Sequence, residues 1–426
     1  MKYFFILGNN PSLSIAEISA FFGLNNTKKP QNNQIKSILL NEAVFILETN
    51  QEINAKELIK KLGGTIKIGL IKAETSQNAL LEETKKLVNE KRSVNLSQNK
   101  ENNNSLLTGK FNFGFSFYGK GKINLKKLGM ETKKHLREKN ISCRWVSSKN
   151  TISEERKSRQ NLALSSVIVE QNNLIKSGIE ISIIEKDNHV LIGQTLAVQA
   201  FKELSARDYG RPARDDQSGM LPPKLAQIML NLGGTKERGV ILDPFCGSGT
   251  ILSEALLMGY EDLIGSDFSE KAINDTKKNI EWIQKKYKIN KSNILLYTLS
   301  AVELSKKIKA NSVSAIITEP YLGPQRGKIN LKKTIQELET LYSRAIFEFE
   351  KILKPNGIIV MLFPVFYNKH FLNPKLGKFK IINPIPENLR KNKIIQTTKR
   401  QSIVYGRENQ KVWREIIIMK KQSSAE

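Results

Sequence analysis

A chain of 426 residues is too long for one ordinary core, so two or three domains are expected. Its hydrophobic content of 39% is sufficient for packed cores. No apolar run approaches the roughly 18 residues that cross a bilayer, and the opening run Tyr3–Leu7 is too short for a secretory signal. The composition therefore predicts no membrane association and a cytoplasmic location.

The charge balance is strongly positive. Lys and Arg number 68 against 41 Asp and Glu, a net charge of +27, which predicts a polyanionic partner such as nucleic acid. An AT-rich coding bias would enrich Lys, but it would enrich Glu as well, so it does not explain the shortage of acids. Cys143 and Cys246 are the two cysteines, and the three histidines lie far apart in the sequence. Their spacing predicts neither a disulfide framework nor a metal site.

Residues 1–70 alternate short apolar strands with amphipathic helices, which predicts a small α+β domain. Gly63-Gly64 ends the second helix. The expected elements are strands at Tyr3–Leu7 and Ala43–Glu48 and helices at Ser14–Phe22 and Ala55–Leu62.

A second segment, residues 71–195, contains a polar stretch and an aromatic strand. Ser93–Ser105 has few apolar residues and predicts a mobile surface loop. Phe111–Tyr118 alternates aromatic and small residues at period two, which favours a strand with one buried aromatic face over aromatic rings that stack on bases.

Basic residues dominate the next stretch. Gly119–Gln160 carries 13 Lys and Arg against 4 Glu around an expected helix at Leu125–Lys139 and a strand at Ser142–Val146. A charge run is usually only a solvated face, but its consistent sign here favours a phosphate-binding surface. Asn173–Gly193 is interpreted as a closing helix and hairpin.

The third part of the chain is a domain junction. Thr195–Ser205 is interpreted as a strand or linker, and Arg207–Pro223 has the Gly, Pro and charged content of a loop, so residues 196–222 are assigned as a linker. Pro223 suits the first position of a helix over Lys224–Leu232, which begins a domain at residues 223–426.

From residue 239 onward, strands and helices alternate, which predicts a parallel sheet with helices on both faces. Two late segments leave no room for a helix between them and predict an antiparallel hairpin at the sheet edge. The expected strands are Val240–Leu242, Asp262–Ser266, Ile294–Leu299, Val313–Ile317 and Ile358–Phe363, the helices are Ser269–Lys285 and Thr334–Leu353, and the hairpin strands are Gln401–Tyr405 and Val412–Met419.

The stretch Val240–Thr250, VILDPFCGSGT, predicts a nucleoside-cofactor pocket at the carboxyl end of the first strand. Gly247 and Gly249 let the backbone approach a ligand, and the helix that begins near Ser248 offers free N–H groups. Asp267 ends the next strand 24 residues after Asp243, where an acid binds ribose hydroxyls; the alternative is an N-cap. S-adenosylmethionine fits better than NAD, because the third glycine of a dinucleotide site is missing.

A second motif, TEPYLG at 318–323, ends the fourth strand. An exocyclic amine is a poor nucleophile because its lone pair is delocalised into the base. Acceptors that bind both N–H groups, held rigid by a proline, direct that lone pair at a methyl group, while an aromatic side chain stacks on the extruded base. The motif therefore predicts that the protein transfers a methyl group to an amino group, with Thr318, Glu319, Pro320 and Tyr321 as its catalytic residues.

Together with RPARDDQSGMLPPKLAQIMLNLG, these motifs resemble the tRNA guanine-N2-methyltransferases that join a THUMP domain to a Rossmann-like methyltransferase domain, in particular the guanosine-10 branch. ILGNNPSLSIAEI, KKHLREKNISCRWV and VYGRENQKVWREIIIM resemble the same branch. The resemblance implies a ferredoxin-like unit at 1–70, a THUMP domain at 71–195, tRNA as partner and a Rossmann-like sheet with an antiparallel edge hairpin. It also allows a small activating protein, as some eukaryotic relatives require. The expected cofactor-binding residues are Asp243, Pro244, Phe245, Cys246, Gly247, Ser248, Gly249, Thr250, Asp267 and Ser300.

Two positions depart from the family pattern. The turn usually reads Asp-Pro-Pro-Tyr, whereas Thr318 and Glu319 stand at its first two positions, and we hypothesise that Glu319 supplies the amine acceptor. The acid that contacts adenine after the third strand appears as Ser300-Ala301. Two other functions stay open: an amino-methyltransferase acting on adenine N6 or guanine N2 of DNA or rRNA, and a non-catalytic RNA-binding protein.

Overall fold

The computed structural model describes residues 1–24, 35–101, 109–148, 162–214, 220–234, 239–324 and 327–422. The chain divides into two compact units. The N-terminal unit comprises Met1–Asn9, Pro30–Lys60 and Thr65–Phe201. The C-terminal unit comprises Asn10–Lys29, Lys61–Gly64 and Lys202–Glu426, so it includes two short segments from early in the sequence.

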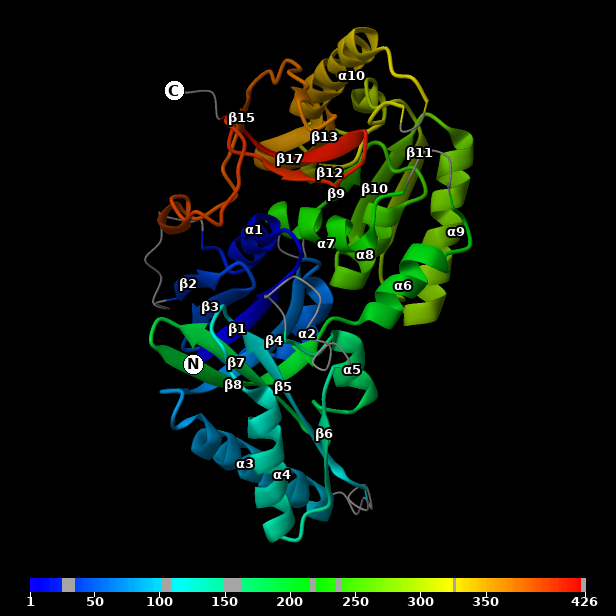
Figure 1. The fold of residues 1–426 in the computed structure, drawn as a ribbon. Helices are drawn as coiled ribbons and strands as arrows, with labels where there is room; N and C mark the ends of the chain where they lie inside the picture. The colour runs from blue at the N-terminus through cyan, green and yellow to red at the C-terminus, as the bar shows by residue number, and fades with distance from the viewer. Residues whose placement is uncertain are drawn as a thin grey trace. The chain divides into compact units, whose positions relative to one another are not determined.

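A mixed sheet forms the centre of the N-terminal unit, with the strand order β2-β3-β1-β4-β8-β7-β5-β6 (Figure 1). β5 runs parallel to β6 and β7, and the other neighbours are antiparallel. The strands are β1 Lys2–Leu7, β2 Lys36–Asn41, β3 Val44–Glu48, β4 Thr65–Thr75, β5 Phe111–Tyr118, β6 Cys143–Val146, β7 Ile179–Lys186 and β8 His189–Val198. The helices of this unit are α2 Ala55–Lys61, α3 Leu80–Glu101, α4 Leu125–Glu138 and α5 Ser166–Gln171.

One sheet runs through both of the segments that the sequence divides at residue 70. That residue lies inside β4, which pairs with β1 on one side and with β8 on the other. The backbone hydrogen bonds of β4 and β8, from Lys67↔Val198 to Thr75↔Val190, therefore join the two segments.

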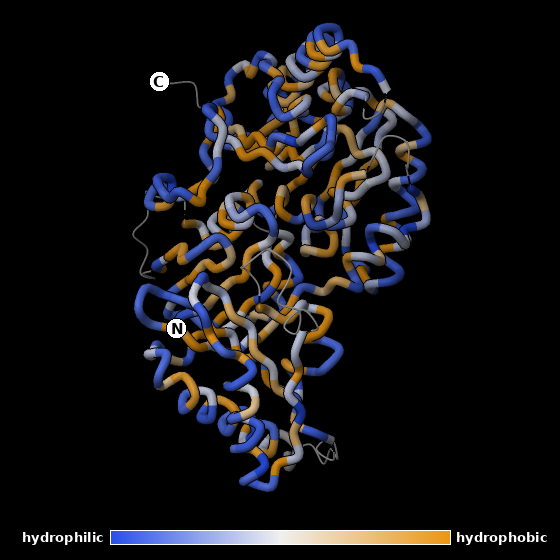
Figure 2. The backbone as a smooth tube through the Cα atoms, viewed as in Figure 1, coloured by the Kyte–Doolittle hydropathy of each residue, from blue (hydrophilic) through white to orange (hydrophobic). Residues whose placement is uncertain are grey.

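The aromatic strand β5 packs as its period predicts. Phe111, Phe113, Phe115 and Phe117 are at most 3% exposed and pack in one hydrophobic cluster with apolar side chains of α3 and α4. In Figure 2 these two helices alternate hydrophilic and hydrophobic residues, as amphipathic helices on a sheet do. The buried aromatic face is confirmed, and these four rings are not available to stack on bases.

Helix α3 corrects one expectation. It continues to Glu101, so the loop predicted for Ser93–Ser105 is wrong as far as that residue; residues 102–105 lie outside the described part. Leu87 and Val88 are buried against the sheet, and Asn95 Nδ2 donates a hydrogen bond to the Ser177 carbonyl at 2.7 Å. These contacts stabilise a polar stretch as helix although its composition indicates a loop.

The C-terminal unit is an α/β unit with the strand order β11-β10-β9-β12-β13-β17-β15. The first five strands in this order are parallel, and β17 is antiparallel to β13. The strands are β9 Ile241–Asp243, β10 Asp262–Asp267, β11 Asn293–Thr298, β12 Val313–Thr318, β13 Leu353–Phe366, β14 His370–Phe371, β15 Phe379–Ile381, β16 Ile403–Tyr405 and β17 Val412–Lys421. The helices are α1 Pro11–Phe21, α6 Phe201–Tyr209, α7 Pro223–Leu232, α8 Thr250–Met258, α9 Glu270–Tyr287 and α10 Leu331–Ile352.

Helices cover both faces of this sheet, with α10 on one face and α7 and α8 on the other (Figure 1). This arrangement confirms the predicted Rossmann-like sheet. β16 and β17 form the predicted antiparallel hairpin at the sheet edge, and β15 pairs with the same outer side of β17 farther along the strand.

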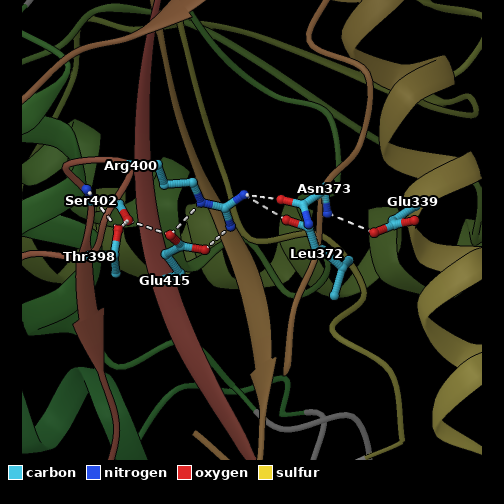
Figure 3. Close-up of polar contacts among 7 residues, drawn as sticks. All are labelled: Glu339, Leu372, Asn373, Thr398, Arg400, Ser402 and Glu415. Atoms are coloured by element: carbon cyan, nitrogen blue, oxygen red, sulfur yellow. Dashed lines mark hydrogen bonds and ion pairs between the residues drawn. The ribbon is translucent and has the colours of Figure 1, made fainter. Parts of the chain in front are cut away.

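The hairpin is fixed by a buried acid. Glu415 in β17 is 0% exposed and binds the Arg400 guanidinium through both carboxylate oxygens, and it also accepts a hydrogen bond from the Ser402 hydroxyl (Figure 3). Arg400 in turn donates to the Leu372 carbonyl at 2.7 Å and to Asn373 Oδ1 at 3.1 Å. These bonds hold the chain before β15 and the chain before β16 against the same strand.

Helix α6 forms inside the segment that the sequence assigns as a linker. Arg207, 8% exposed, binds Glu254 of α8 with Nε–Oε1 and Nη2–Oε2 distances of 2.6 and 3.1 Å, and Gln227 of α7 donates to the same carboxylate at 3.0 Å. The interpretation of Thr195–Ser205 as strand or linker is therefore wrong after β8, where this buried ion pair stabilises a helix.

Helix α1 is held to α7 by another buried acid. Glu17 is 0% exposed and accepts hydrogen bonds from the Gly63 and Gly64 amides and from Asn231 Nδ2, each at 2.8 Å. Gly63-Gly64 thus does more than end a helix: it supplies two donors to this carboxylate. Among the described residues, no helix is both long enough and apolar enough to cross a membrane.

Candidate active site

The predicted site residues come together at the carboxyl ends of β9, β10 and β12. The chain leaves β9 toward β10 on one side, whereas β12 lies on the other side of β9. Side chains that follow these strands therefore surround the switch point of the sheet, where open α/β sheets bind ligands.

The glycine turn after β9 is shaped for close approach. Gly249 caps α8 with a φ of +79°, and a Cβ at this position would lie 2.8 Å from Thr276 Cγ2, so a larger residue is excluded. Thr276 Oγ1 donates to the Gly247 carbonyl at 2.8 Å. Gly247 has a φ of +51°, and a Cβ there would meet no atom within 4 Å. The backbone at Gly247 is thus open on the side that a ligand would approach.

Asp267 connects this turn to β10. Its Oδ2 accepts a hydrogen bond from the Gly247 amide at 3.1 Å, and its Oδ1 accepts from the Ser269 amide at 3.0 Å. Ser269 is itself the N-cap of α9, accepting from the Ala272 amide at 3.3 Å, so the N-cap alternative for Asp267 is wrong. The carboxylate keeps lone pairs for further donors such as ribose hydroxyls.

Phe268, directly after Asp267, is 79% exposed, and the sequence analysis did not single it out. A single exposed ring is common on protein surfaces, but this one lies directly beside Asp267 and offers an apolar face there. Its position directly after Asp267, the residue expected to bind ribose, is the sequence signal that could have identified it.

Asp243 lies at the end of β9 and is 2% exposed. Its Oδ1 accepts hydrogen bonds from the Thr318 hydroxyl at 2.7 Å and from the Phe245 amide at 3.3 Å. Burial raises the pKa of Asp243 to about 7, although these hydrogen bonds oppose the increase and the charges of Asp267 and Glu319 add to it. This carboxyl can therefore change protonation state near neutral pH.

The turn after β12 places each residue of TEPY differently. Thr318 is fully buried and Pro320 is buried, whereas Tyr321 is 58% exposed. Glu319 Oε1 accepts a hydrogen bond from Arg414 Nε of β17 at 2.6 Å. The Tyr321 side chain is thus exposed to solvent, while Glu319 is held by a cation from the terminal hairpin.

Two residues that support the turn were missed from the sequence. Arg414 binds Glu319, and the Tyr342 hydroxyl of α10 donates to the Tyr321 carbonyl at 2.8 Å. Arg414 follows Trp413 in the VYGRENQKVWREIIIM segment, but no local pattern indicated which residue it would bind.

The other expected cofactor residues lie around the glycine turn. Pro244 is buried and Phe245 half-buried, while burial raises the pKa of the Cys246 thiol well above its usual value. Ser300 is half-buried after β11, and the neighbouring Leu299 amide donates to the Asp267 carbonyl at 2.8 Å.

A further support comes from the RPAR sequence before α7. Arg211 Nη1 donates to Thr250 Oγ1 at 2.6 Å, and Asn279 Nδ2 donates to the Ser248 carbonyl at 2.8 Å and to the Ala213 carbonyl at 2.9 Å. Arg211 and Ala213 lie in a loop as predicted, and this loop is held to the glycine turn, directly by Arg211 and through Asn279 at Ala213.

The arrangement fits a nucleoside cofactor. The open backbone at Gly247, the Asp267 carboxylate and the exposed Phe268 ring offer close approach, an acceptor for hydroxyl groups and an apolar face. Within the described ranges, no group of three or more His, Cys, Asp or Glu side chains could hold a metal ion. Cys143 and Cys246 are both free thiols.

Comparison with known proteins agrees with this chemistry. Residues 211–372 match the family described as UPF0020, RMKL-like, methyltransferase domain. The chain is 31% identical over 201 residues to the tRNA (guanine(10)-N2)-dimethyltransferase of Methanocaldococcus jannaschii, covering 45% of this chain and 51% of that protein. It is 30% identical over 147 residues to the U6 snRNA (guanine-N(2))-methyltransferase THUMPD2 of Bos taurus, covering 34% of this chain and 26% of that protein.

The chain thus spans about half the length of the archaeal relative. Among solved structures, TrmN from Thermus thermophilus superimposes with a TM-score of 0.51 and 15% identity, covering 99% of this chain and 100% of that one, a likeness of fold alone. Together, the family match and the named relatives confirm the resemblance that the motifs indicate.

Proposed function

We propose, starting from the methyltransferase-domain family to which residues 211–372 belong, that this chain methylates the exocyclic N2 amine of a guanosine in tRNA, at position 10. The observation that carries the proposal is the convergence of Gly247, Asp267, Thr318 and Tyr321 at one edge of the sheet. The names of the similar archaeal proteins, tRNA (guanine(10)-N2)-dimethyltransferases, support guanine N2 and position 10 as the target.

The cofactor in this proposal is S-adenosylmethionine. It would supply an electrophilic methyl group, so the protein needs to orient the amine rather than to provide a strong base. Asp267 would hold the ribose hydroxyls, Gly247 and Gly249 would leave room for the donor beside the turn, and Phe268 would cover the adenine ring. Ser300, at the end of β11, would make the weaker polar contact to adenine.

The target base would lie on Tyr321. A base inside an RNA helix or fold is out of reach of the turn, so it must first be extruded, and an exposed aromatic ring stabilises the extruded state by stacking. The Tyr342 hydroxyl fixes the Tyr321 carbonyl, and Arg414 fixes Glu319, so both ends of the turn are oriented before the substrate binds.

The N-terminal unit would bind the body of the tRNA, with residues 1–70 as a ferredoxin-like domain and 71–195 as a THUMP-like domain. Helix α4 and its flanks present exposed cations on one side of the Phe-rich core: Lys122, Lys126, Lys127, Lys134, Arg137 and Lys139. Such a surface neutralises backbone phosphates without reading sequence.

Two measurements test the activity. Calorimetry with S-adenosylmethionine should show binding that Asp267→Ala weakens, and tritiated methyl groups should then appear in unmodified tRNA as N2-methylguanosine when the nucleosides are separated by mass spectrometry. A chain that binds the cofactor but labels adenine, DNA or rRNA would support the amino-methyltransferase alternative. A chain that binds tRNA but no cofactor would support the RNA-binding module.

The exposed aromatic residues provide a matched pair of variants. Phe268→Ala should weaken cofactor binding by about tenfold, because an aromatic contact with a base contributes ~1–3 kcal/mol. Phe347→Ala removes a ring that is 60% exposed on α10 and should leave cofactor binding unchanged. Equal effects of the two variants would contradict the assignment of Phe268.

A further inference from the structure

Thr318 replaces the aspartate expected at the first position of the turn, and a hydroxyl carries no negative charge. The structure places a carboxylate directly behind it. The Thr318 hydroxyl donates to Asp243 Oδ1 at 2.7 Å, and the two residues are 0% and 2% exposed. They come from neighbouring strands β12 and β9, so the sheet fixes their spacing.

This hydrogen bond gives the threonine oxygen a defined role. Because the hydroxyl proton points at Asp243, the oxygen lone pairs can accept a hydrogen bond from an amine once substrate binding uncovers Thr318, which is 0% exposed in this structure. A carboxylate partner also polarises the hydroxyl and makes its oxygen a better acceptor. Within the part of the chain that the structure describes, Thr318 Oγ1 donates this bond and accepts none, and both hydrogen bonds to Asp243 are accepted by Oδ1, so Oδ2 accepts none.

Glu319 is placed differently. Its carboxylate is bound by Arg414 at 2.6 Å, and the side chains of this pair are 14% and 16% exposed. The guanidinium compensates the negative charge and restrains the side chain. This pair is therefore suited to holding the turn, whereas the hydrogen-bond donors to Asp243 among the described residues are uncharged, the Thr318 hydroxyl and the Phe245 amide.

We propose that Thr318 and Asp243 act as one proton acceptor for the substrate amine, a role that rests on the methyl transfer proposed above. Thr318 Oγ1 accepts the amine hydrogen bond, Asp243 is the final proton acceptor, and Glu319 is a positioning residue. The pair does the work of the single aspartate expected at this turn.

The protons and electrons balance as follows. The amine nitrogen uses its lone pair to form the N–C bond, while the methyl–sulfur bond breaks and its electron pair stays on sulfur. The nitrogen is then cationic and releases a proton to Thr318 Oγ1 as the threonine hydroxyl proton moves to Asp243. Asp243 ends as a carboxylic acid and returns its proton to solvent before the next turnover.

The electrostatics of Asp243 suit this role. Burial raises its pKa to about 7, and the titratable groups near it are Asp267, Glu319 and the Cys246 thiol. Above pH 7 the carboxylate is available to accept a proton, and below pH 7 it already carries one. Methyl transfer should therefore slow as the pH falls through about 7.

Four variants separate the roles in single-turnover methyl transfer at pH 8 with saturating tRNA and cofactor. Thr318→Val and Asp243→Asn should each lower the rate by about 100-fold, and the double variant should lose little more, because the residues act as a unit. Thr318→Ser should keep most of the rate. Glu319→Gln should cost no more than about tenfold, since it removes a positioning contact.

Thr340→Val is the matched control, because it makes the same chemical change on the exposed face of α10 and should not alter the rate. If the wild-type protein is active and Thr318→Val transfers methyl groups at the same rate, the role of the pair is overturned but the proposed function is not. Wild-type protein that transfers no methyl group to any nucleic acid would overturn the proposed function itself.

Infrared titration of the free protein gives a second readout that does not depend on turnover. The protonated-carboxyl band with a midpoint near pH 7 should lose the contribution of Asp243 in Asp243→Asn, while the contribution of Glu17, whose pKa is also about 7, remains. The midpoint should move upward in Thr318→Val, because the hydrogen bond that favours the charged form is lost. If neither substitution changes the intensity or the midpoint of this band, the proposal is overturned.

Discussion

Glu415 and Asp243 are both buried carboxylates on strands of the C-terminal sheet, but their partners differ. Glu415 binds the Arg400 guanidinium and the Ser402 hydroxyl (Figure 3), whereas Asp243 accepts hydrogen bonds from the Thr318 hydroxyl and the Phe245 amide. A buried carboxylate that binds a cation stabilises the fold, because the cation neutralises its charge. A buried carboxylate with uncharged donors stays sensitive to protons, which is a property that a catalytic site can use.

The largest stability effect is expected where the cation is removed. Arg400→Met leaves Glu415 buried with one hydroxyl donor and should lower the free energy of unfolding by about 3–5 kcal/mol. Denaturant unfolding of the full chain measures this change. Lys333→Met, which breaks an exposed pair with Glu337, is the control and should cost less than about 0.5 kcal/mol. Arg400→Met combined with Glu415→Met should recover more than half of the loss; failure to recover would mean that packing, not charge, dominates.

A pH dependence is expected at Glu17, which resembles Asp243 because it is buried and accepts hydrogen bonds from uncharged amide donors. Burial raises the pKa of Glu17 from 4.5 to about 7. Its stabilising contribution is therefore complete below pH 4.5 and is lost as the pH rises to 7, on the order of 3 kcal/mol. Glu17→Gln should reduce the difference in unfolding free energy between pH 5 and pH 8. Asp243 contributes with the same sign, so part of the slope should persist; an unaltered slope would exclude Glu17 as a source.

Removing the charge of Asp243 and removing the charge of Glu415 should change the free energy of unfolding in opposite directions. At pH 8, Asp243→Asn removes a buried charge that has no cation and should leave stability unchanged or raise it by about 1 kcal/mol, although it slows methyl transfer. Glu415→Gln leaves Arg400 without its counter-charge and should destabilise the protein by about 1–3 kcal/mol. Thermal unfolding of the two variants measures both changes in stability. Equal destabilisation by the two substitutions would contradict the difference proposed between the two carboxylates.

The smallest stability effect is expected at the pair that holds the turn. Arg414→Met should cost about 1 kcal/mol or less, because both side chains keep some contact with solvent. Its effect on methyl transfer should match that of Glu319→Gln within a factor of about three, since each variant removes the same ion pair. A rate loss from Arg414→Met that far exceeds the loss from Glu319→Gln would indicate that Arg414 has another partner.

The sequence by itself determined the parallel sheet, the glycine turn and the two acids that end β9 and β10, because periodicity and turn residues are local properties of the chain. It also indicated the buried aromatic face of β5 from the period-two alternation of four phenylalanines. These features depend on residues within a few positions of one another, and a strand or turn forms wherever that local pattern occurs.

The tertiary structure decided which side chains meet. Arg414 binds Glu319 across 95 residues and Thr318 binds Asp243 across 75 residues, and neither pairing is visible in any local pattern. The same holds for the helical end of α3 and for α6, where buried contacts override polar composition. Long-range pairing and burial set the charge of a carboxyl group, so the chemistry of Asp243 follows from the packed sheet and not from its neighbours in sequence.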